Sequence, residues 1–233
     1  MNVKIFADGA DLKVIKELTN NPFVRGFTCN PTLMRKAGVT DDKEFAQEAI
    51  QLVSPLPISL EVFKDDPMQI MYQAQEISTW GMNVYVKIPV TNTKKQEMYS
   101  VIKILSDQGI KVNVTAVTTL DQVLDCTKAL KNSMGGYISV FAGRIADTGR
   151  DPVPRMQQAV SIIDDGNKDI ELIWASPREL LNVVQADEIG VDIITVTKDI
   201  LDKLYLIGKN LEEYSLDTVK MFYKDATESG FKL

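Results

Sequence analysis

The sequence predicts an α/β fold, a TIM (β/α)8 barrel with an extra C-terminal helix. Eight short apolar, β-branched segments recur along the 233 residues, and amphipathic stretches separate them. No linker, low-complexity stretch or break in composition divides the chain, and barrels of this length commonly form one domain. We therefore expect residues 1–233 to form a single barrel domain.

Most of the expected strands are apolar throughout and do not alternate between apolar and polar residues. This pattern is typical of parallel strands that are covered on both faces. An open, doubly wound sheet is the alternative, and the absence of GxGxxG and GxxxxGK[ST] motifs disfavours its nucleotide-binding form. The eight segments are Val3–Ala7, Arg25–Thr28, Ile58–Phe63, Val84–Ile88, Lys111–Thr115, Tyr137–Phe141, Glu171–Ala175 and Asp192–Val196.

Capping residues and glycines mark the helix boundaries. The clearest amphipathic segments are Asp66–Trp80, Lys94–Gln108, Leu120–Leu130 and Pro152–Asp164. A capping residue before proline predicts helix starts at Asn30-Pro31, Asp66-Pro67, Asp151-Pro152 and Ser176-Pro177. Helices are expected to stop at Gly81, Gly109 and Gly190.

A further helix is expected at the C-terminus, over about residues 215–232. Its apolar side chains share one side of the helix and are Leu216, Val219, Phe222, Tyr223 and Ala226. This side packs either on the chain's own barrel or against a neighbouring subunit, and the pattern favours neither placement.

Composition excludes several classes of function. The net charge is 26 − 32 = −6, so no basic surface indicates nucleic acid or an anionic membrane as a partner. No segment is apolar over the length needed to span a bilayer. Lys4, Asp8 and Asp11 interrupt the region where a signal peptide would be apolar, so we expect a cytoplasmic protein.

The chain contains no histidine and two cysteines. The missing imidazole excludes histidine-dependent triads, HExxH zinc sites and histidine general bases. Two cysteines cannot build a disulfide framework, and no spacing suggests a metal site. Proton transfer in an enzyme of this composition must use carboxylates, lysine, tyrosine, hydroxyl groups or water.

The candidate site consists of residues at or just after the carboxyl ends of the expected strands, because function in a TIM barrel collects there. These residues are Asp8, Asn30, Glu61, Lys87, Asn113, Thr115, Ser139, Phe141, Arg144, Ser176 and Arg178.

Lys87 is the central candidate, because it lies in the apolar run Val-Tyr-Val-Lys-Ile-Pro-Val. Burial penalises the ammonium form and favours a free amine, which can attack a carbonyl group and form a Schiff base. The alternative is a lysine at a strand end that extends to solvent.

Three further candidates have structural alternatives. Glu61 is a carboxylate in an apolar strand and needs a partner or a proton there. It is either a functional group or part of a structural ion pair, with Lys87 as one possible partner. Asp8 and Asn30 are either functional groups or helix N-caps.

The segment Ser176-Pro177-Arg178-Glu179 predicts a capping box, which accounts for Ser176 and Glu179. It does not account for Arg178, because a cation in the first helical turn opposes the helix dipole unless an anion binds there. Arg178 and Arg144 are therefore candidates for a phosphate clamp, with solvated surface arginines as the alternative.

Together the candidates make a class I aldolase site, with an amine, two carboxylates, hydroxyl and amide groups, and two arginines. The segments that carry the candidates are residues 4–8, 26–32, 58–62, 86–91, 109–115, 137–145 and 175–178. In these segments the chain resembles the small-subunit transaldolases and the related fructose-6-phosphate aldolases, and the similarity spans nearly its whole length.

The resemblance implies a transaldolase that needs no metal or organic cofactor. Lys87 would form a Schiff base with fructose 6-phosphate or sedoheptulose 7-phosphate and pass the dihydroxyacetone unit to an aldose phosphate. Asp8 would take the proton from the hydroxyl group next to the cleaved bond, and Glu61 and Thr115 would transfer protons through a shared water molecule. The groups implied to bind the sugar and its phosphate are Asn30, Asn113, Ser139, Phe141, Arg144, Ser176 and Arg178.

Other functions stay open at this point. One is a lyase like the fructose-6-phosphate aldolases, another is a transaldolase-like enzyme with a different sugar, and a third is a non-catalytic barrel that binds a sugar phosphate. The aldolases resemble each other in carrying Gln and Tyr where this chain has Glu61 and Phe141, which favours the transferase. The resemblance also implies the pentose phosphate pathway and a homo-oligomer, with a decamer of barrels as one candidate assembly.

Overall fold

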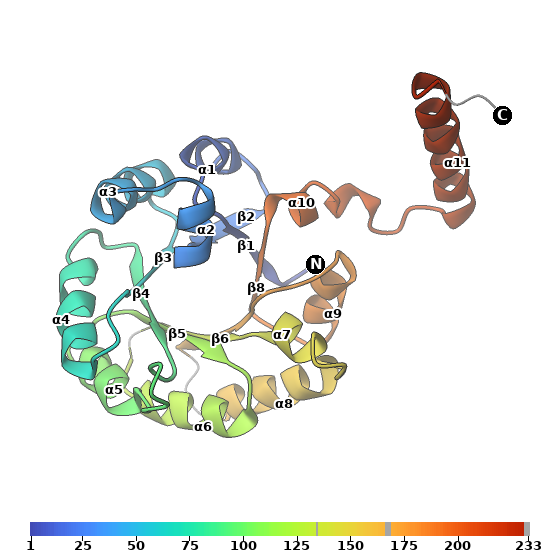
Figure 1. The fold of residues 1–233 in the computed structure, drawn as a ribbon. Helices are drawn as coiled ribbons and strands as arrows, with labels where there is room; N and C mark the ends of the chain where they lie inside the picture. Colours follow the sequence, from blue (N-terminus) through green and yellow to red (C-terminus); the bar gives the residue numbers. More distant parts are fainter. Residues whose placement is uncertain (134, 166–168, 231–233) are drawn as a thin grey trace.

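The computed structural model describes residues 1–133, 135–165 and 169–230, which include a closed barrel of eight parallel strands surrounded by helices (Figure 1). The strands follow one another in sequence order, and β1 pairs with both β2 and β8 to close the barrel. The predicted TIM-barrel fold is confirmed. The strands are β1 (Lys4–Asp8), β2 (Val24–Thr28), β3 (Ile58–Glu61), β4 (Val84–Pro89), β5 (Val112–Val117), β6 (Gly136–Val140), β7 (Ile170–Trp174) and β8 (Ile193–Val196).

Each strand begins and ends within two residues of the predicted bounds. The third strand was predicted to run too far: β3 ends at Glu61, and Phe63 is 44% exposed. β5 instead continues two residues beyond the prediction. Ala116, one residue before the end of β5, adopts a φ of 61°, and the β5–β6 register shifts between Val114 and Val117. This bulge turns the end of β5 at the rim of the barrel.

Most of the helices lie between successive strands, on the outside of the barrel (Figure 1). None of those among the described residues is long and apolar enough to cross a lipid bilayer. The helices are α1 (Leu12–Leu18), α2 (Pro31–Lys36), α3 (Asp42–Val53), α4 (Pro67–Ser78), α5 (Tyr99–Asp107), α6 (Leu120–Ala129), α7 (Ala142–Ala146), α8 (Val153–Asp164), α9 (Leu181–Glu188), α10 (Lys198–Leu201), the 3-10 helix η1 (Leu204–Leu206) and α11 (Leu211–Glu228).

Two of the four predicted capping residues act as expected. The side chain of Asn30 accepts a hydrogen bond from Leu33 N at the start of α2. That of Asp66 accepts from Met68 N and Gln69 N at the start of α4. Asp151 lies one residue further from its helix, because Pro152 occupies the N-cap position of α8.

The capping box predicted at Ser176 is wrong. Ser176 adopts a φ of 61°, which is left-handed backbone, and α9 begins five residues later at Leu181. The intervening backbone is held by Asn182, whose Oδ1 accepts from the N–H groups of Arg178 and Glu179 at 2.7 and 3.2 Å. Ser176 therefore belongs to the loop after β7.

The predicted helix over residues 94–108 begins too early. In the structure α5 starts at Tyr99. The preceding residues form a turn, in which Asn92 Oδ1 accepts from Lys94 N and Gln96 N at 3.0 and 2.9 Å and Lys95 has a φ of 62°. A short polar side chain that bonds to nearby backbone N–H groups competes with a helix, and here the turn prevails.

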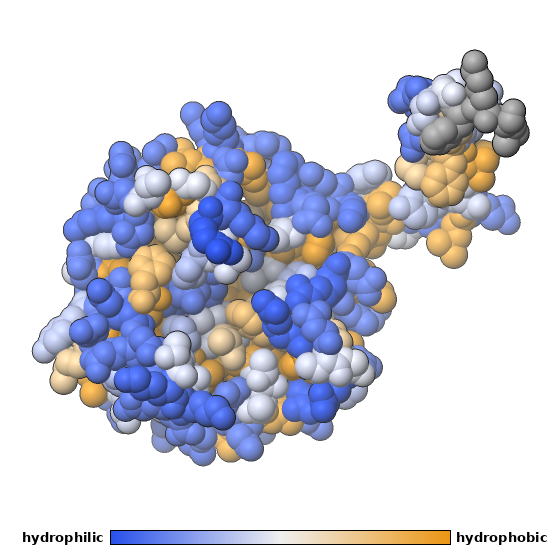
Figure 2. Space-filling model, in the orientation of Figure 1, coloured by the Kyte–Doolittle hydropathy of each residue, from blue (hydrophilic) through white to orange (hydrophobic). Residues whose placement is uncertain are grey.

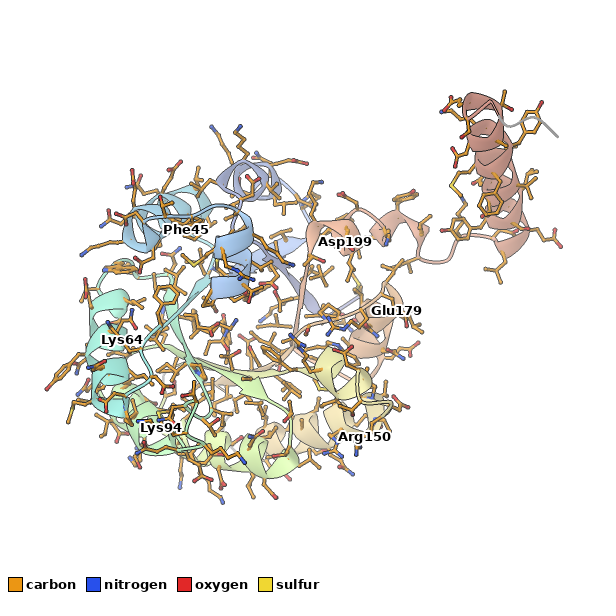
Figure 3. All side chains as sticks on the ribbon, in the orientation of Figure 1. Phe45, Lys64, Lys94, Arg150, Glu179 and Asp199 are labelled. Carbon is orange, nitrogen blue, oxygen red and sulfur yellow. The ribbon has the colours of Figure 1, made fainter. Side chains whose placement is uncertain are left out.

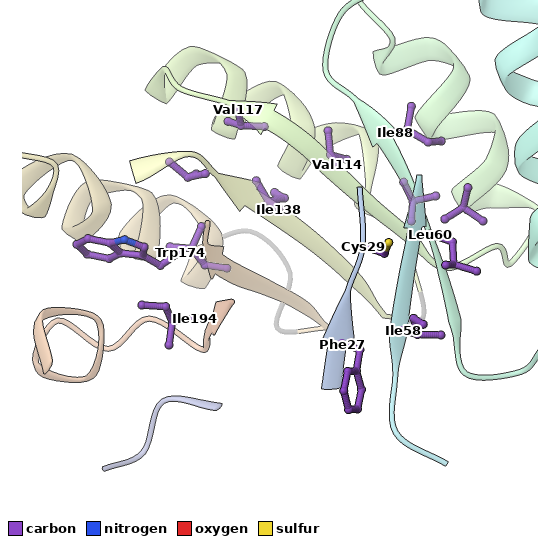
Figure 4. Packing of buried hydrophobic residues seen from close by; sticks show 14 of the residues in the cluster. Phe27, Cys29, Ile58, Leu60, Ile88, Val114, Val117, Ile138, Trp174 and Ile194 are labelled. Carbon is purple, nitrogen blue, oxygen red and sulfur yellow. The ribbon is translucent and has the colours of Figure 1, made fainter. Parts of the chain in front are cut away.

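The strands present two faces with different chemistry. The outward face is aliphatic and packs against the helices, as Figure 4 shows for Val114, Ile138 and Ile194, which are fully buried. The inward face carries alternate residues, since neighbouring side chains of a strand point to opposite sides. Side chains from many elements fill the middle of the barrel (Figure 3).

Aromatic rings close the barrel interior toward the amino ends of the strands. Tyr137 stacks on Tyr85 with ring centroids 4.0 Å apart, and Phe6 meets Tyr137 edge-on at 5.8 Å. Gly26 makes room for this aromatic floor, because a Cβ there would come within 2.6 Å of the Phe6 ring. Asp8 and Lys87 lie two residues further along β1 and β4 than Phe6 and Tyr85, on the same inward face.

The C-terminal helix α11 stands away from the barrel (Figure 1). It begins at Leu211, four residues before the predicted start, and residues 231 and 232 of the predicted helix lie outside the described residues. None of its residues is buried, so packing on the chain's own barrel, one of the two expected placements, is contradicted. Figure 2 shows hydrophobic surface on this helix.

Candidate active site

A pocket of about 450 Å³ opens at the carboxyl ends of the strands and contains ten of the eleven predicted site residues. Strand ends, and the loops and short helices that follow them, supply its lining. The predicted residues in it are Asp8, Asn30, Glu61, Lys87, Thr115, Ser139, Phe141, Arg144, Ser176 and Arg178. Asn113 lies just beneath, fully buried.

Lys87 lies in this pocket with a neighbouring carboxylate. β3 and β4 pair in a register that sets Glu61 beside Lys87, and Lys87 Nζ lies 3.2 Å from Glu61 Oε2. Nζ also donates to the backbone oxygen of Cys29 at 3.5 Å. Lys87 is 5% exposed, so the alternative of a lysine extending to solvent is contradicted. The ion pair with Lys87, which was the structural alternative for Glu61, is present.

Asp8 faces the same pocket from the end of β1. Burial raises the pKa of Asp8 above its ordinary value, while the charge of Lys87 and a hydrogen bond from Thr28 act in the opposite direction. Thr28 Oγ1 donates to Asp8 Oδ1 at 2.8 Å and lies 2.5 Å from Thr195 Oγ1. Asp8 caps no helix, because Asp11 is the N-cap of α1.

A layer of hydrogen-bonded polar side chains lies below Lys87. Asn113 Nδ2 donates to Ser59 Oγ at 2.9 Å, and Ser139 Oγ donates to Asn113 Oδ1 at 2.7 Å. All three residues are buried, so this network satisfies groups that would otherwise be costly to bury. Thr115 Oγ1 is buried in the pocket wall with no hydrogen-bond partner among the described residues, which leaves it able to bond a ligand or water.

The two predicted arginines differ in their surroundings. Arg178 makes a two-pronged ion pair with Asp147, through Nε at 2.9 Å and Nη2 at 2.5 Å. This contact raises the pKa of Arg178 and lowers that of Asp147. Arg144 lies in α7, and among the described residues no carboxylate is close enough to form an ion pair with it.

A close backbone contact positions the loop that carries Ser176 and Arg178. A Cβ on Gly143 would lie 1.6 Å from the carbonyl oxygen of Ser176, so only glycine allows α7 to approach this loop. The contact brings the loop after β7 against the helix that carries Arg144.

Sequence reasoning missed several polar residues. Five line the pocket, namely Thr28, Thr32, Lys36, Thr195 and Thr197, and two lie beside it, Ser59 and Asp147. Ser59, Thr28 and Thr195 lie inside apolar strands. A single small hydroxyl residue does not change the apolar pattern that predicts such a strand. Ser59 lies two residues before Glu61, Thr28 lies two residues before Asn30, and Thr195 pairs with Phe6 in β1; these positions were the available signal. Asp147 lies 31 residues from Arg178, so only the fold brings the two together.

The remaining polar groups do not add a metal centre or a thiol nucleophile. Among residues 1–133, 135–165 and 169–230, no three His, Cys, Asp or Glu side chains gather in a way that could hold a metal ion. Burial, assisted by Asp8, raises the pKa of the Cys29 thiol to about 12, so it stays protonated at neutral pH. The chemistry available here is that of an amine, carboxylates and hydroxyl groups.

A larger cavity, of about 620 Å³, lies toward the amino ends of β4 and β5. Its lining is mostly apolar or uncharged, and the single charged residue there, Lys111, donates to the backbone oxygen of Met82 at 2.9 Å. We assign the site to the smaller pocket, because reactive groups converge there and none do so in the larger one.

The family described as Transaldolase/Fructose-6-phosphate aldolase matches residues 5–233 of this chain. Two similar proteins both carry the name probable transaldolase. The protein of Methanococcus maripaludis strain C7 is 34% identical over 218 residues, which are 92% of this chain and 97% of that protein. The protein of Thermoanaerobacter sp. strain X514 is 32% identical over 231 residues, or 99% and 100% of the two chains.

Solved structures with little sequence identity share the barrel. A putative phosphonomutase from Burkholderia cenocepacia superposes with a TM-score of 0.60 at 10% identity, covering 96% of this chain and 94% of that one. An N-acetylneuraminate lyase from Mycoplasma synoviae gives 0.56 at 11% identity, covering 95% and 80%. These two likenesses concern the fold alone. The match over residues 5–233 decides the family: this chain belongs to the transaldolase/fructose-6-phosphate aldolase family.

Proposed function

We propose that this chain is a transaldolase, which transfers a dihydroxyacetone unit from a ketose phosphate to an aldose phosphate through a Schiff base on Lys87. The observation that carries the proposal is the buried amine of Lys87, 3.2 Å from Glu61, in a pocket shared with Asp8 and two arginines. Lys87 is 5% exposed, and its amine lies in the pocket where the carbonyl carbon of a ketose can reach it and form a Schiff base. The family and the names of the two relatives support the same activity.

The proposed reaction begins when Lys87 Nζ attacks the C2 carbonyl carbon of the donor, and loss of water leaves a protonated Schiff base. Glu61 and Thr115 exchange protons with the reacting groups through a shared water molecule. Asp8 removes the proton from the C4 hydroxyl group, the C3–C4 bond breaks, and its electron pair moves toward the Schiff-base nitrogen. An aldose phosphate leaves, and an enamine remains on Lys87.

The second half of the reaction reverses these steps on another sugar. The enamine carbon attacks the aldehyde carbon of the acceptor, Asp8 returns the proton to the new hydroxyl group, and water releases the product from Lys87. The raised pKa of Asp8 suits this role, because a carboxylate that holds its proton more tightly is a stronger base.

The remaining residues are proposed to hold the substrate. Asn30 and Ser139 contact donor hydroxyl groups, and Asn113 orients Ser139 through their 2.7 Å hydrogen bond. Arg144, Arg178 and Ser176 bind the phosphate group. Phe141 forms part of the pocket wall.

An assay with fructose 6-phosphate, with and without erythrose 4-phosphate, tests this proposal. Glyceraldehyde 3-phosphate release should rise many-fold when the acceptor is present, and little free dihydroxyacetone should form without it. Rapid turnover in the absence of an acceptor would instead identify a fructose-6-phosphate aldolase-like lyase.

Phe141→Tyr provides the sharper comparison. A tyrosine hydroxyl at this position can orient water or donate a proton to the enamine, and the phenylalanine ring cannot. The variant should release more free dihydroxyacetone per transfer event than the wild type. An unchanged ratio would show that this position does not decide between transfer and cleavage.

We also propose that α11 joins copies of this chain into a homo-oligomer. Its apolar side chains are exposed, among them Leu211 at 81%, Phe222 at 62% and Tyr223 at 76%. Large exposed apolar groups of this kind favour burial against a partner. Light scattering should give a multiple of the 26.0 kDa chain, and removal of residues 211–233 should reduce it. A full-length monomer contradicts the proposal.

For this enzyme we expect a cytoplasmic location and a role in the pentose phosphate pathway.

A further inference from the structure

A smaller cavity, of about 370 Å³, adjoins the active-site pocket on the side of α7. Arg144 lines both cavities and so stands between them. The chain carries a net charge of −6, yet this cavity is lined by three arginines and no acidic residue. The lining residues are Thr118, Arg144, Ile145, Thr148, Arg150 and Arg155.

Among the described residues the arginines of this cavity form no ion pair, although the charge of Arg144, after the hydrogen bond from Arg178, lowers the pKa of Asp147. In the part of the chain that the structure describes, Arg178 pairs with Asp147, and no ion pair involves Arg144, Arg150 or Arg155. The nearby carboxylate of Asp151 accepts a hydrogen bond from Val153 N at the start of α8.

Arg150 is held in place on one side only. Its Nη1 donates to Thr148 Oγ1 at 2.7 Å, and Thr148 Oγ1 in turn donates to the carbonyl oxygen of Ile145 at 2.7 Å. Among the described residues this guanidinium makes no other hydrogen bond, so its remaining N–H groups are left for another acceptor. Figure 3 shows Arg150 near α8, away from the middle of the barrel.

We propose that this cavity is a second phosphate site, in which Arg150 and Arg155 bind phosphoryl oxygens and Thr118 adds a hydroxyl group. The positive charges that line this cavity repel each other. A dianion bound between them attracts each guanidinium group and offsets this repulsion. Guanidinium groups match the geometry of phosphate oxygens, and the volume falls within the range of small-molecule sites. Arg155 also lies in the first turn of α8, where its positive charge opposes the helix dipole.

The ligand is a phosphate monoester from one of two sources. It is either the second phosphate of a sugar bisphosphate whose other end occupies the active-site pocket, or the phosphate of a separate metabolite. The first source rests on the proposed function, and the second does not.

Calorimetric titration of the full-length protein with inorganic phosphate tests the site. The wild type should bind two phosphate ions, one at Arg178 and one here. The double variant Arg150→Gln/Arg155→Gln should weaken one of them about tenfold to a hundredfold, while Arg178→Gln should weaken the other. Arg25→Gln/Arg35→Gln, a matched loss of two arginines elsewhere, should keep both. A wild type with one site, or a double variant that retains both, overturns the proposal.

Two further measurements separate this result from other causes. Borohydride trapping of Lys87 with unphosphorylated dihydroxyacetone requires neither phosphate site, so normal trapping in the double variant shows an intact barrel. Trapping that fails in the wild type contradicts the proposed function and leaves the phosphate titration valid on its own.

Kinetics distinguish the two sources. A bisphosphate substrate predicts that the double variant raises KM for a ketose bisphosphate about tenfold or more and leaves KM for the monophosphate unchanged. A separate metabolite predicts that added phosphate changes kcat/KM for the monophosphate in the wild type and not in the double variant. Either result supports the second phosphate site. If neither is seen and the double variant still binds phosphate as the wild type does, the proposal is wrong.

Discussion

The two ends of the barrel contain the same kinds of residue in different surroundings. Each end has a lysine beside a cavity, but Lys111 at the amino end bonds to a backbone oxygen, whereas Lys87 at the carboxyl end faces a carboxylate. The cavity at the amino end is larger, at about 620 Å³ against 450 Å³. The comparison shows that volume does not locate the chemistry of a barrel. Convergence of ionisable groups from several strands does so, and matched variants at the two ends make this testable.

The largest difference is expected between the two lysines. Lys87→Ala removes the proposed nucleophile and should lower kcat by about a thousandfold or more. Lys111→Ala should leave kcat within about twofold, because its ammonium group bonds to the backbone oxygen of Met82 and lies over the Tyr85 ring, at the end of the barrel away from Lys87. Borohydride reduction with a ketose phosphate, followed by peptide mass analysis, should label Lys87. A label on another lysine would overturn the assignment.

The next comparison concerns two carboxylates, Asp8 at one end of β1 and Asp187 beside its other end. Asp8→Asn should lower kcat/KM by about 10²–10⁴-fold, the usual contribution of a general base. In the wild type, kcat/KM should fall as pH drops through the pKa of Asp8, and this limb should lie above the ordinary aspartate range because burial raises that pKa.

Ionisation of Asp8 and ionisation of Asp187 should have opposite effects on the stability of the folded protein. Because burial raises the pKa of Asp8, the folded protein binds that proton more tightly than the unfolded chain, and ionisation of Asp8 reduces stability as pH rises through the raised pKa. Asp8→Asn should therefore raise Tm at pH 7. Hydrogen bonds from Val3 N and then Asn2 N lower the pKa of Asp187, so its contribution is present above the ordinary pKa and lost as pH falls through the lowered one. Asp187→Asn should lower Tm at pH 7 and leave kcat/KM unchanged. A loss of stability in Asp8→Asn would contradict this contrast.

Two arginines provide the smallest expected effect. Arg178→Gln should raise KM for phosphorylated donors about tenfold to a hundredfold, equivalent to about 1.5–3 kcal/mol for a charged hydrogen bond. KM for an unphosphorylated ketose should stay nearly constant. Arg25 donates to the backbone oxygens of Pro22 and Val24 at the start of β2, and Arg25→Gln should alter neither value. Equal losses for both substrate types in Arg178→Gln would indicate a structural arginine.

The fold and most members of the candidate site could be predicted from the sequence, because both depend on local order along the chain. Apolar runs such as Val84–Ile88 define strands, and a polar residue at the end of such a run lies at the carboxyl end of a barrel. Lys87, Glu61 and Asp8 follow from this rule alone. Their convergence in one pocket needed no knowledge of sequence-distant contacts.

The failures share a physical cause, which is competition from interactions that the local pattern does not encode. Ser176 looked like a helix cap, but its left-handed backbone and the contact with Gly143 place it in a loop. Residues 94–98 looked helical, but the side chain of Asn92 organises them as a turn. The partner of Arg178, Asp147, comes from a different loop. None of the residues of α11 is buried in the structure, and the periodicity of its apolar residues did not decide between the two expected placements.

The aromatic floor of Phe6, Tyr85 and Tyr137 has a consequence for the order of events during turnover. Because these rings pack across the barrel interior on the amino side of Lys87, we expect every sugar to enter and leave the pocket from the carboxyl ends of the strands. For the proposed transfer, the aldose released from the donor must therefore depart before the acceptor can take its place. Initial rates measured against both substrates should give parallel double-reciprocal lines, the pattern of a ping-pong enzyme whose Lys87 carries the three-carbon unit while the pocket is exchanged.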